Sequence, residues 1–402
     1  MNKLIKNIAI FVFLGIVFSA DISKIYSSDA GVVPTILDLS DYLSYKYKGF
    51  DIGIKSLRVG ETFDDNVAFS KENKINDFIT DVGFTVGVNY TGKRRSLSLT
   101  SLIINHTYAE NSVYDNVSED LNFGFTNEFS EYDRVSLSNI FSHTEAPLFS
   151  DTNFNSDQFG RPNGRWEYFK NRLNFNYSRD INKQLSASIR YANTLDYYSG
   201  INIPGSSSNK PGIVMNYIFT PFTSFSLSYD YFDVQFDNNR DAAQHEIAAN
   251  VIKNITKKIS VSMSGGVDFI RSFNDEELTK PLFSASIGYE KDANTRMGVS
   301  FYKHYGVTPY IADLFDQWNT SASLSRQISE RLNYNLSIFY GVGKYVTAGT
   351  EQTLKGVTST FTYDIYKNLF GNFTYSYTDS DYNNSFNGYT RNTFYLGLSA
   401  AF

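Results

Sequence analysis

The residues best suited to acid–base or metal chemistry in this sequence are four histidines, His106, His143, His245 and His304. No two of them have the short spacing of metal ligands on one element. His143 precedes Glu145 by two residues, and Asp233 and Asp241 lie near His245, so acid–base pairs at the ends of structural elements are conceivable. We interpret them as chance neighbours among loop charges. The sequence predicts no enzyme, and neither a catalytic residue, a cofactor nor a metal centre.

Other chemistry is excluded by composition. The 402 residues include no cysteine, which removes disulfide scaffolds, thiolate metal sites and cysteine nucleophiles. The net charge of −6 argues against a nucleic-acid partner. The acidic segment 379–381 could hold calcium, but solvated loop charge is the simpler interpretation. No glycine-rich phosphate loop leads from a strand into a helix.

The elements that would position any site are strands. In 185–191, leucine, alanine, isoleucine and tyrosine alternate with serine and arginine, and 225–231, 259–267 and 332–340 repeat this alternation, with Phe339 as an exception. A period of two places apolar side chains on one face of a β-strand and polar side chains on the other. The sequence therefore predicts an all-β fold built from two-faced strands.

Turn signals divide the chain into hairpins. Short turns fall near residues 92, 132, 181, 222, 256, 292, 329 and 366, and longer polar loops alternate with them. Eight turn-linked strand pairs, a first strand near 50–59 and a last strand near 391–402 give about 18 strands, with 16 as the alternative count. The long loops are expected at 60–77, 110–117, 145–164, 196–209, 236–242, 272–280, 305–315, 343–352 and 379–389.

The apolar face is expected to meet lipid. The polar face consists mainly of serine, threonine, asparagine and glycine, as in a hydrated lumen, whereas a soluble sandwich would carry more charge there. Turns of about 2–6 residues at one end and loops of about 7–20 at the other are typical of outer-membrane barrels. Aromatic residues near the turns fit interfacial girdles, namely Tyr90, Phe129, Tyr177, Phe219, Tyr289 and Tyr363. We predict a transmembrane antiparallel up-and-down β-barrel in the bacterial outer membrane.

The first thirty residues resemble an export signal. Lys3 and Lys6 precede an apolar run over 8–18, and small residues follow up to Ala30. We predict a signal peptide over 1–30, with Ala20 as a second cleavage position and an uncleaved anchor as the alternative. A periplasmic leader is expected over 31–49 and the transmembrane barrel over 50–402.

The chain ends in an alternating segment. Its apolar positions are Phe394, Leu396, Leu398, Ala400 and Phe402. Nine residues of tilted strand cover roughly 23 Å of the membrane normal, close to the apolar band of such barrels. This ending resembles the terminal-strand signature by which the barrel-assembly machinery recognises outer-membrane proteins. The resemblance implies that these five residues form an assembly signal.

A second resemblance concerns about 40 residues near the start of the barrel. The segment Gly60-Glu61-Thr62-Phe63-Asp64-Asp65-Asn66-Val67, followed by 76–80, is similar to the beginning of a family of outer-membrane β-barrel porins, some of which are associated with exopolysaccharide systems. Asp64, Asp65 and Asn66 match the family motif. The same three residues are also typical of an ordinary turn.

The parity of the strands predicts which charges face the lumen. These pore candidates are Asp81, Glu128, Lys170, Arg172, Arg190, Asp230, Asp268 and Arg296. Four are acidic and four basic, so their sum gives no ion preference. Arg326 is expected on the outward face at a strand end. Among inward aromatic residues, only Phe339 and Phe370 are clear. Loop 145–164 either folds inward and narrows the pore or projects outward.

The predicted function is passive diffusion of small hydrophilic solutes or ions through the barrel. Alternatives are the barrel of an exopolysaccharide export or surface-anchoring system, a structural or adhesive scaffold and, with least support, an outer-membrane hydrolase. Expected partners are outer-membrane lipid, the barrel-assembly machinery, and small solutes or a polysaccharide. Oligomerisation is left open, because outward leucine and phenylalanine suit lipid as well as a second barrel.

Overall fold

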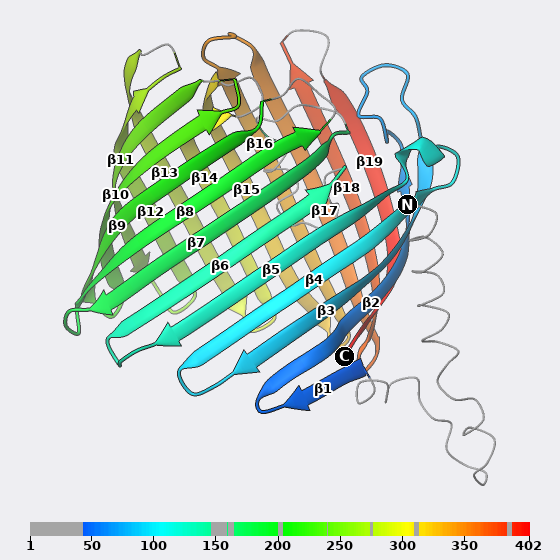
Figure 1. Cartoon of the computed structure of the whole chain (residues 1–402), viewed down its shortest axis with the longest axis horizontal. Coiled ribbons are helices and arrows are strands. Elements are labelled where there is room, and N and C mark those ends of the chain that lie inside the picture. Colours follow the sequence, from blue (N-terminus) through cyan, green and yellow to red (C-terminus); the bar gives the residue numbers. More distant parts are fainter. Residues whose placement is uncertain are drawn as a thin grey trace.

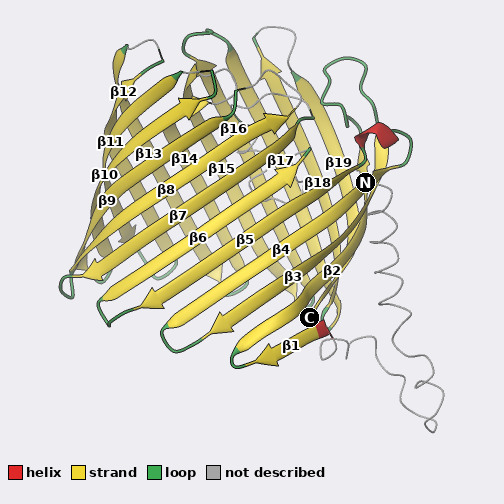
Figure 2. Ribbon diagram, viewed as in Figure 1, coloured by secondary structure: helices red, strands yellow, loops and turns green. Residues whose placement is uncertain are grey.

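The computed structural model describes residues 43–145, 159, 165–199, 204–238, 240–273, 276–308, 313–383 and 388–402. The predicted signal peptide and most of the predicted leader lie outside this range. Strands account for most of the described chain (Figure 2). A single turn of 3₁₀ helix, η1 (Ser112–Tyr114), lies between two of them. No helix among the described residues is long and apolar enough to cross a lipid bilayer.

Nineteen strands are present in the described chain. They are β1 (Ser44–Tyr47), β2 (Phe50–Asp64), β3 (Asp77–Thr91), β4 (Arg95–Tyr108), β5 (Asn116–Glu128), β6 (Asp133–Thr144), β7 (Glu167–Asp180), β8 (Leu185–Ser199), β9 (Ser206–Thr220), β10 (Thr223–Phe236), β11 (Asp241–Asn254), β12 (Ile259–Arg271), β13 (Glu277–Asp292), β14 (Thr295–Thr308), β15 (Asp313–Ser329), β16 (Leu332–Tyr345), β17 (Glu351–Tyr366), β18 (Leu369–Tyr382) and β19 (Tyr389–Ala401).

Strands β2 to β19 form a closed cylinder. Each pairs antiparallel with the next along the chain, and β19 returns to pair with β2. The strands tilt strongly around the wall (Figure 1), as closure of a sheet into a barrel requires. The described residues thus confirm an antiparallel up-and-down barrel of 18 strands rather than 16.

The short strand β1 extends the seam where the barrel closes. Residues 56–64 of β2 pair with β19, and residues 50–53 of the same strand pair with β1. The backbone amide of Phe402 donates a hydrogen bond to the Lys55 carbonyl oxygen between these two segments, at 2.9 Å. One edge of β2 is therefore bonded along most of its length, which limits the unpaired strand edge at this end of the barrel.

The two ends of the barrel differ, and the strands are longer than predicted. Short turns join strands at one end; between β9 and β10 only two residues intervene. The opposite end, called the long-loop end below, carries the larger connections. Two of its loops are shorter than predicted. In the loop predicted over 196–209, β8 continues to Ser199 and β9 begins at Ser206; in that predicted over 379–389, β18 continues to Tyr382 and β19 begins at Tyr389. Strand pairing thus extends into segments that the sequence predicts as loops.

The large apolar side chains point away from the lumen. Ile189, Leu227 and Leu396 are 54%, 55% and 66% exposed on the isolated barrel, and each lies on the predicted apolar parity of its strand. Phe394 and Leu398, two other residues of the predicted assembly signal, are also exposed. Such an outer surface is stable against lipid or another apolar surface, since a contiguous apolar belt of this kind is rare on soluble monomers.

Candidate functional site

The inner wall is built by the second set of alternating positions. Its side chains contact residues two strands away: Arg190 on β8 reaches Asp230 on β10, across β9. Side chains on the concave face of a barrel converge, whereas those on the convex face diverge, so contacts that skip a strand identify the concave face. The alternating positions that carry the charged side chains of these strands therefore line the lumen.

Three ion pairs occupy the inner wall between β7 and β11. They are Lys170–Asp196 at 3.9 Å, Arg190–Asp230, and Lys210–Glu246 at 3.0 Å. The Asp230 side chain is 1% exposed while that of Arg190 is 41% exposed, so the guanidinium lies on the lumen side of the pair. Each pair holds a positive and a negative charge within contact distance. The net field along this part of the wall is consequently small.

The remaining pore candidates lie at several depths. Asp81 contacts His106, and Arg172 lies two residues from Lys170 on β7. Glu128 pairs with Arg134 at 2.8 Å, and Arg296 with Glu290 at 3.5 Å, both near the short turns and well exposed. The sequence-predicted residues are therefore spread around and along the lumen wall rather than gathered in one cluster.

Asp268 is the most enclosed of the candidates. It is fully buried on β12, directly opposite Glu246 of β11. Within the described part of the chain, neither of its carboxylate oxygens has a hydrogen bond of standard geometry, although the Gln244 side chain on β11 interacts with it. Lys280 is its cross-strand neighbour on β13, but the Lys280 ammonium group lies over the Tyr305 ring, 5.3 Å from its centroid.

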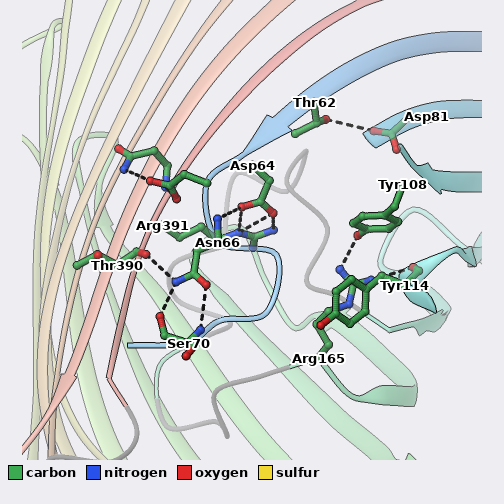
Figure 3. Close-up of polar contacts among 12 residues, drawn as sticks. Thr62, Asp64, Asn66, Ser70, Asp81, Tyr108, Tyr114, Arg165, Thr390 and Arg391 are labelled. Carbon is green, nitrogen blue, oxygen red and sulfur yellow. Dashed lines mark hydrogen bonds and ion pairs between the residues drawn. The ribbon is translucent and has the colours of Figure 1, made fainter. Parts of the chain in front are cut away.

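The motif Asp64-Asp65-Asn66 joins the first barrel strand to the last (Figure 3). Asp64 accepts hydrogen bonds from the Nε of Arg391, 3.0 Å away, and from its terminal nitrogen. Asp65 accepts from the backbone and side-chain amides of Asn392, both at 2.7 Å. The Asn66 amide donates to the Thr390 carbonyl oxygen at 2.9 Å. All three residues thus bond β19, some 325 residues away in sequence, in addition to forming a turn.

The loop after this motif packs against the same seam. Phe69 has a φ of +53° and places its ring under the Arg391 guanidinium, 4.2 Å from the ring centroid. Its ring also meets Tyr389 edge-on, at 5.2 Å. The Asp64–Arg391 pair is therefore closed off from water, with the side chains 0% and 1% exposed.

Most of loop 145–164 lies outside the described residues, but Phe159 lies within them. Its ring contacts Phe315 on β15 and Phe339 on β16, with centroids 5.1 and 5.8 Å apart. A side chain at Gly341 would collide with it. β15 lies nine positions from β6 in the order of strands, on the far side of the barrel. Phe159 is therefore inside the lumen, against the wall opposite the strands that its loop connects.

Several inner-wall residues were not singled out from the sequence. Asp196, Lys210, Glu246 and Arg391 complete ion pairs, and Phe315 and Tyr345 add to the inward aromatics Phe339 and Phe370. In β9, Pro211 and Gly212 interrupt the alternation, and β11 contains four alanines, so neither strand shows a clear apolar face. The prediction that only two aromatic residues clearly face inward was wrong because β15 begins at Asp313 and β16 continues to Tyr345, inside the loops predicted over 305–315 and 343–352.

The fold resembles solved barrels at very low identity. No family model and no curated protein matches the sequence. Pseudomonas aeruginosa OccK2 (OpdF), solved in complex with glucuronate, has a TM-score of 0.50 and 9% identity, with 87% of this chain and 98% of that chain covered. P. aeruginosa OpdL has a TM-score of 0.47 and 12% identity, covering 86% and 97%.

A third similar structure is longer. The FrpB iron transporter of Neisseria meningitidis has a TM-score of 0.45 and 10% identity over 84% of this chain, which spans only 62% of that transporter. Together, the closed wall, the apolar outside and the match to OccK2 decide the fold. The chain is an outer-membrane β-barrel. A barrel with an apolar belt and polar interior satisfies every backbone group inside lipid, so its place is the bacterial outer membrane.

Proposed function

We propose that this barrel is a channel for passive diffusion of small hydrophilic solutes or ions. The observation that carries the proposal is the inner wall: 18 strands present paired charges and hydroxyl groups to the lumen, while the large apolar side chains face outward. Barrels of 16–18 strands are wide enough for an aqueous channel. Diffusion through such a lumen needs no covalent step, so transport itself calls for no catalytic residue.

Paired charges favour weak ion selectivity. A permeating ion meets Arg190 with Asp230 and Lys210 with Glu246, so attraction and repulsion nearly offset at each level. OccK2 was solved with glucuronate, a small hydrophilic solute. A solute of comparable size is the class that we assign to this channel, with modest dependence on its charge.

The remaining parts of the chain fit the same role. We infer that residues 1–30 direct export and that Phe394, Leu396, Leu398, Ala400 and Phe402 are recognised by the barrel-assembly machinery. The first three of these side chains are exposed on the outer face, where the machinery or lipid can contact them.

The exopolysaccharide alternative lacks a supporting surface. Polymer conduction calls for aromatic rings exposed along the lumen, on which sugars can stack. Among the inner aromatics, Phe315, Phe339 and Tyr345 are instead buried, with exposures of 2%, 6% and 1%. Phe315 packs on Tyr345, and the Phe159 ring covers Phe315 and Phe339. In the described part of the wall, this cluster offers no open row of rings.

A recording in a planar lipid bilayer tests the channel directly. Purified protein should insert and give discrete conductance steps that scale with bulk salt, as expected for a water-filled pore. Protein unfolded before addition is the control and should give no steps. Silence from folded protein, under conditions in which a known porin conducts, would refute the proposed function.

A further inference from the structure

A serine, a histidine and an aspartate are joined in series on the inner wall near the long-loop end. The Nδ1 of His106 on β4 lies 2.6 Å from a carboxylate oxygen of Asp81 on β3, and its Nε2 lies 2.9 Å from the Oγ of Ser118 on β5. The barrel register explains the contact. Asp81 pairs directly with His106, and Ser118 pairs with Ile104, which lies two residues before His106 on β4. The adjacent strands β3, β4 and β5 thus contribute one side chain each to the hydrogen-bonded series.

The chemistry of the three side chains determines which atom donates each hydrogen bond. Ionised Asp81 can only accept, so Nδ1 of His106 carries the proton that it shares with the carboxylate. The neutral ring then has a lone pair on Nε2, which accepts from the Ser118 hydroxyl. Thr62 donates to the second carboxylate oxygen of Asp81, at 3.5 Å, and helps to hold it. This is the arrangement in which a histidine can remove a serine proton as the hydroxyl attacks a carbonyl carbon.

A cation lies beside the series. Arg58 on β2 lies in the same cross-strand row as Ser118, through Gly83 of β3 and Ile104 of β4. Gly83, its cross-strand neighbour, leaves room for this side chain to cross the wall. The Nε–H of Arg58 has no acceptor among the described residues. Backbone amides in a paired sheet are occupied, so a side-chain donor of this kind is what a developing oxyanion would need.

The site is small and closed on its rim side. Ser118 is 1% exposed. Two residues toward the rim from His106, Tyr108 accepts a hydrogen bond from Arg165, whose guanidinium also lies over the Tyr108 and Tyr114 rings at 4.7 and 4.9 Å (Figure 3). Because Ser118 is almost fully enclosed, an acyl group of two carbons suits the site better than a long chain.

We propose that Ser118, His106 and Asp81 form an esterase site in the lumen, acting on short acyl esters, such as an acetylated hydrophilic solute. The Ser118 oxygen bonds the ester carbonyl carbon while its proton passes to Nε2 of His106. The carbon–oxygen bond to the alcohol then breaks, and His106 returns the proton to the departing alkoxide. Water, deprotonated by the same nitrogen, hydrolyses the acetyl-serine to acetate and restores the hydroxyl. Asp81 acts as a positioning residue for the histidine.

Covalent labelling tests the nucleophile. Purified folded barrel is treated with a small fluorophosphonate and, in parallel, assayed with p-nitrophenyl acetate. We expect a phosphonyl group on Ser118 by peptide mass spectrometry and loss of ester hydrolysis of about 100-fold or more in Ser118→Ala and His106→Gln. Ser142→Ala is the matched control, because Ser142 bonds the Asp120 carboxylate on the same inner wall without a histidine partner. It should retain the parent rate.

Rescue by a conservative variant separates positioning from mere structure. In Asp81→Asn the carboxylate that orients His106 is gone, so kcat should fall with little change in KM, and Asp81→Glu should recover part of the loss. Bilayer conductance should persist in every variant, which keeps the test independent of the channel proposal. Unlabelled Ser118 in a conducting barrel, or equal hydrolysis by Ser118→Ala and Ser142→Ala, would overturn the esterase site and leave these residues a structural hydrogen-bond network.

Discussion

The Arg391→Met variant is expected to unfold at a markedly lower denaturant concentration than the parent barrel. Methionine keeps much of the side-chain volume but leaves the Asp64 carboxylate, which is 0% exposed, without its cation. Removing one partner of a buried ion pair costs about 3–5 kcal/mol, because the remaining charge stays in a poorly solvated site. The loss falls at the seam between β2 and β19, where the cylinder closes.

The control for this prediction is an exposed pair on the same barrel. Arg271 and Asp241 are joined at 3.0 Å but are 52% and 57% exposed, so Arg271→Met should lower the free energy of unfolding by no more than about 1 kcal/mol. Unfolding can be followed by tryptophan fluorescence and by the gel mobility of unheated samples. Replacing Asp64 with leucine in the Arg391→Met background should recover part of the loss. Equal effects of Arg391→Met and Arg271→Met would show that the seam pair is not buried in the protein.

A second large effect is expected on ion selectivity. Arg190→Gln leaves Asp230 uncompensated in the lumen wall, and Asp230→Asn leaves Arg190 uncompensated. A unit charge about 8 Å from an ion in water contributes about 0.5 kcal/mol, or roughly a twofold change in the local concentration of each ion at low salt. The first variant should therefore raise the cation-to-anion permeability ratio roughly two- to fourfold, and the second should lower it by a similar factor.

Reversal potentials across a salt gradient measure this ratio. Arg326→Gln serves as the control, because Arg326 lies on the outward parity of β15 near a short turn and is exposed. Its removal should leave the reversal potential unchanged. Shifts of the same sign in Arg190→Gln and Asp230→Asn would contradict the placement of this pair beside the ion path.

The sequence predicts the wall of this barrel well because each strand obeys a local rule. In residues 185–191 of β8 and 259–267 of β12, apolar and polar positions alternate, so both the strand and its lipid-facing side follow from residue type alone. The same parity identifies Arg190 and Asp230 as inward charges. That the two side chains bond each other does not follow, because the contact depends on the curvature that brings β8 and β10 together across β9.

The contacts between residues on different strands cannot be predicted from the sequence, for a related reason. His106 lies 25 residues from Asp81 and 12 from Ser118, so a search for ligand or catalytic spacing along the chain passes over it. Only the register of β3, β4 and β5 makes the three residues neighbours. Likewise, Asp64, Asp65 and Asn66 have the composition of a turn, and their bonds to β19 follow from ring closure rather than from local sequence.

Cysteine accessibility on a single strand tests the central claim most directly. The chain has no cysteine, so single substitutions give no background. Ala187 and Ser188 are adjacent on β8, with Ala187 on the outward parity and Ser188 on that of Arg190. In protein reconstituted into lipid vesicles, a charged, membrane-impermeant thiol reagent should modify Ser188→Cys and reduce its conductance, while Ala187→Cys stays protected by lipid. Equal modification at both positions, or protection of Ser188→Cys alone, would show that the wall does not separate lipid from a water-filled lumen.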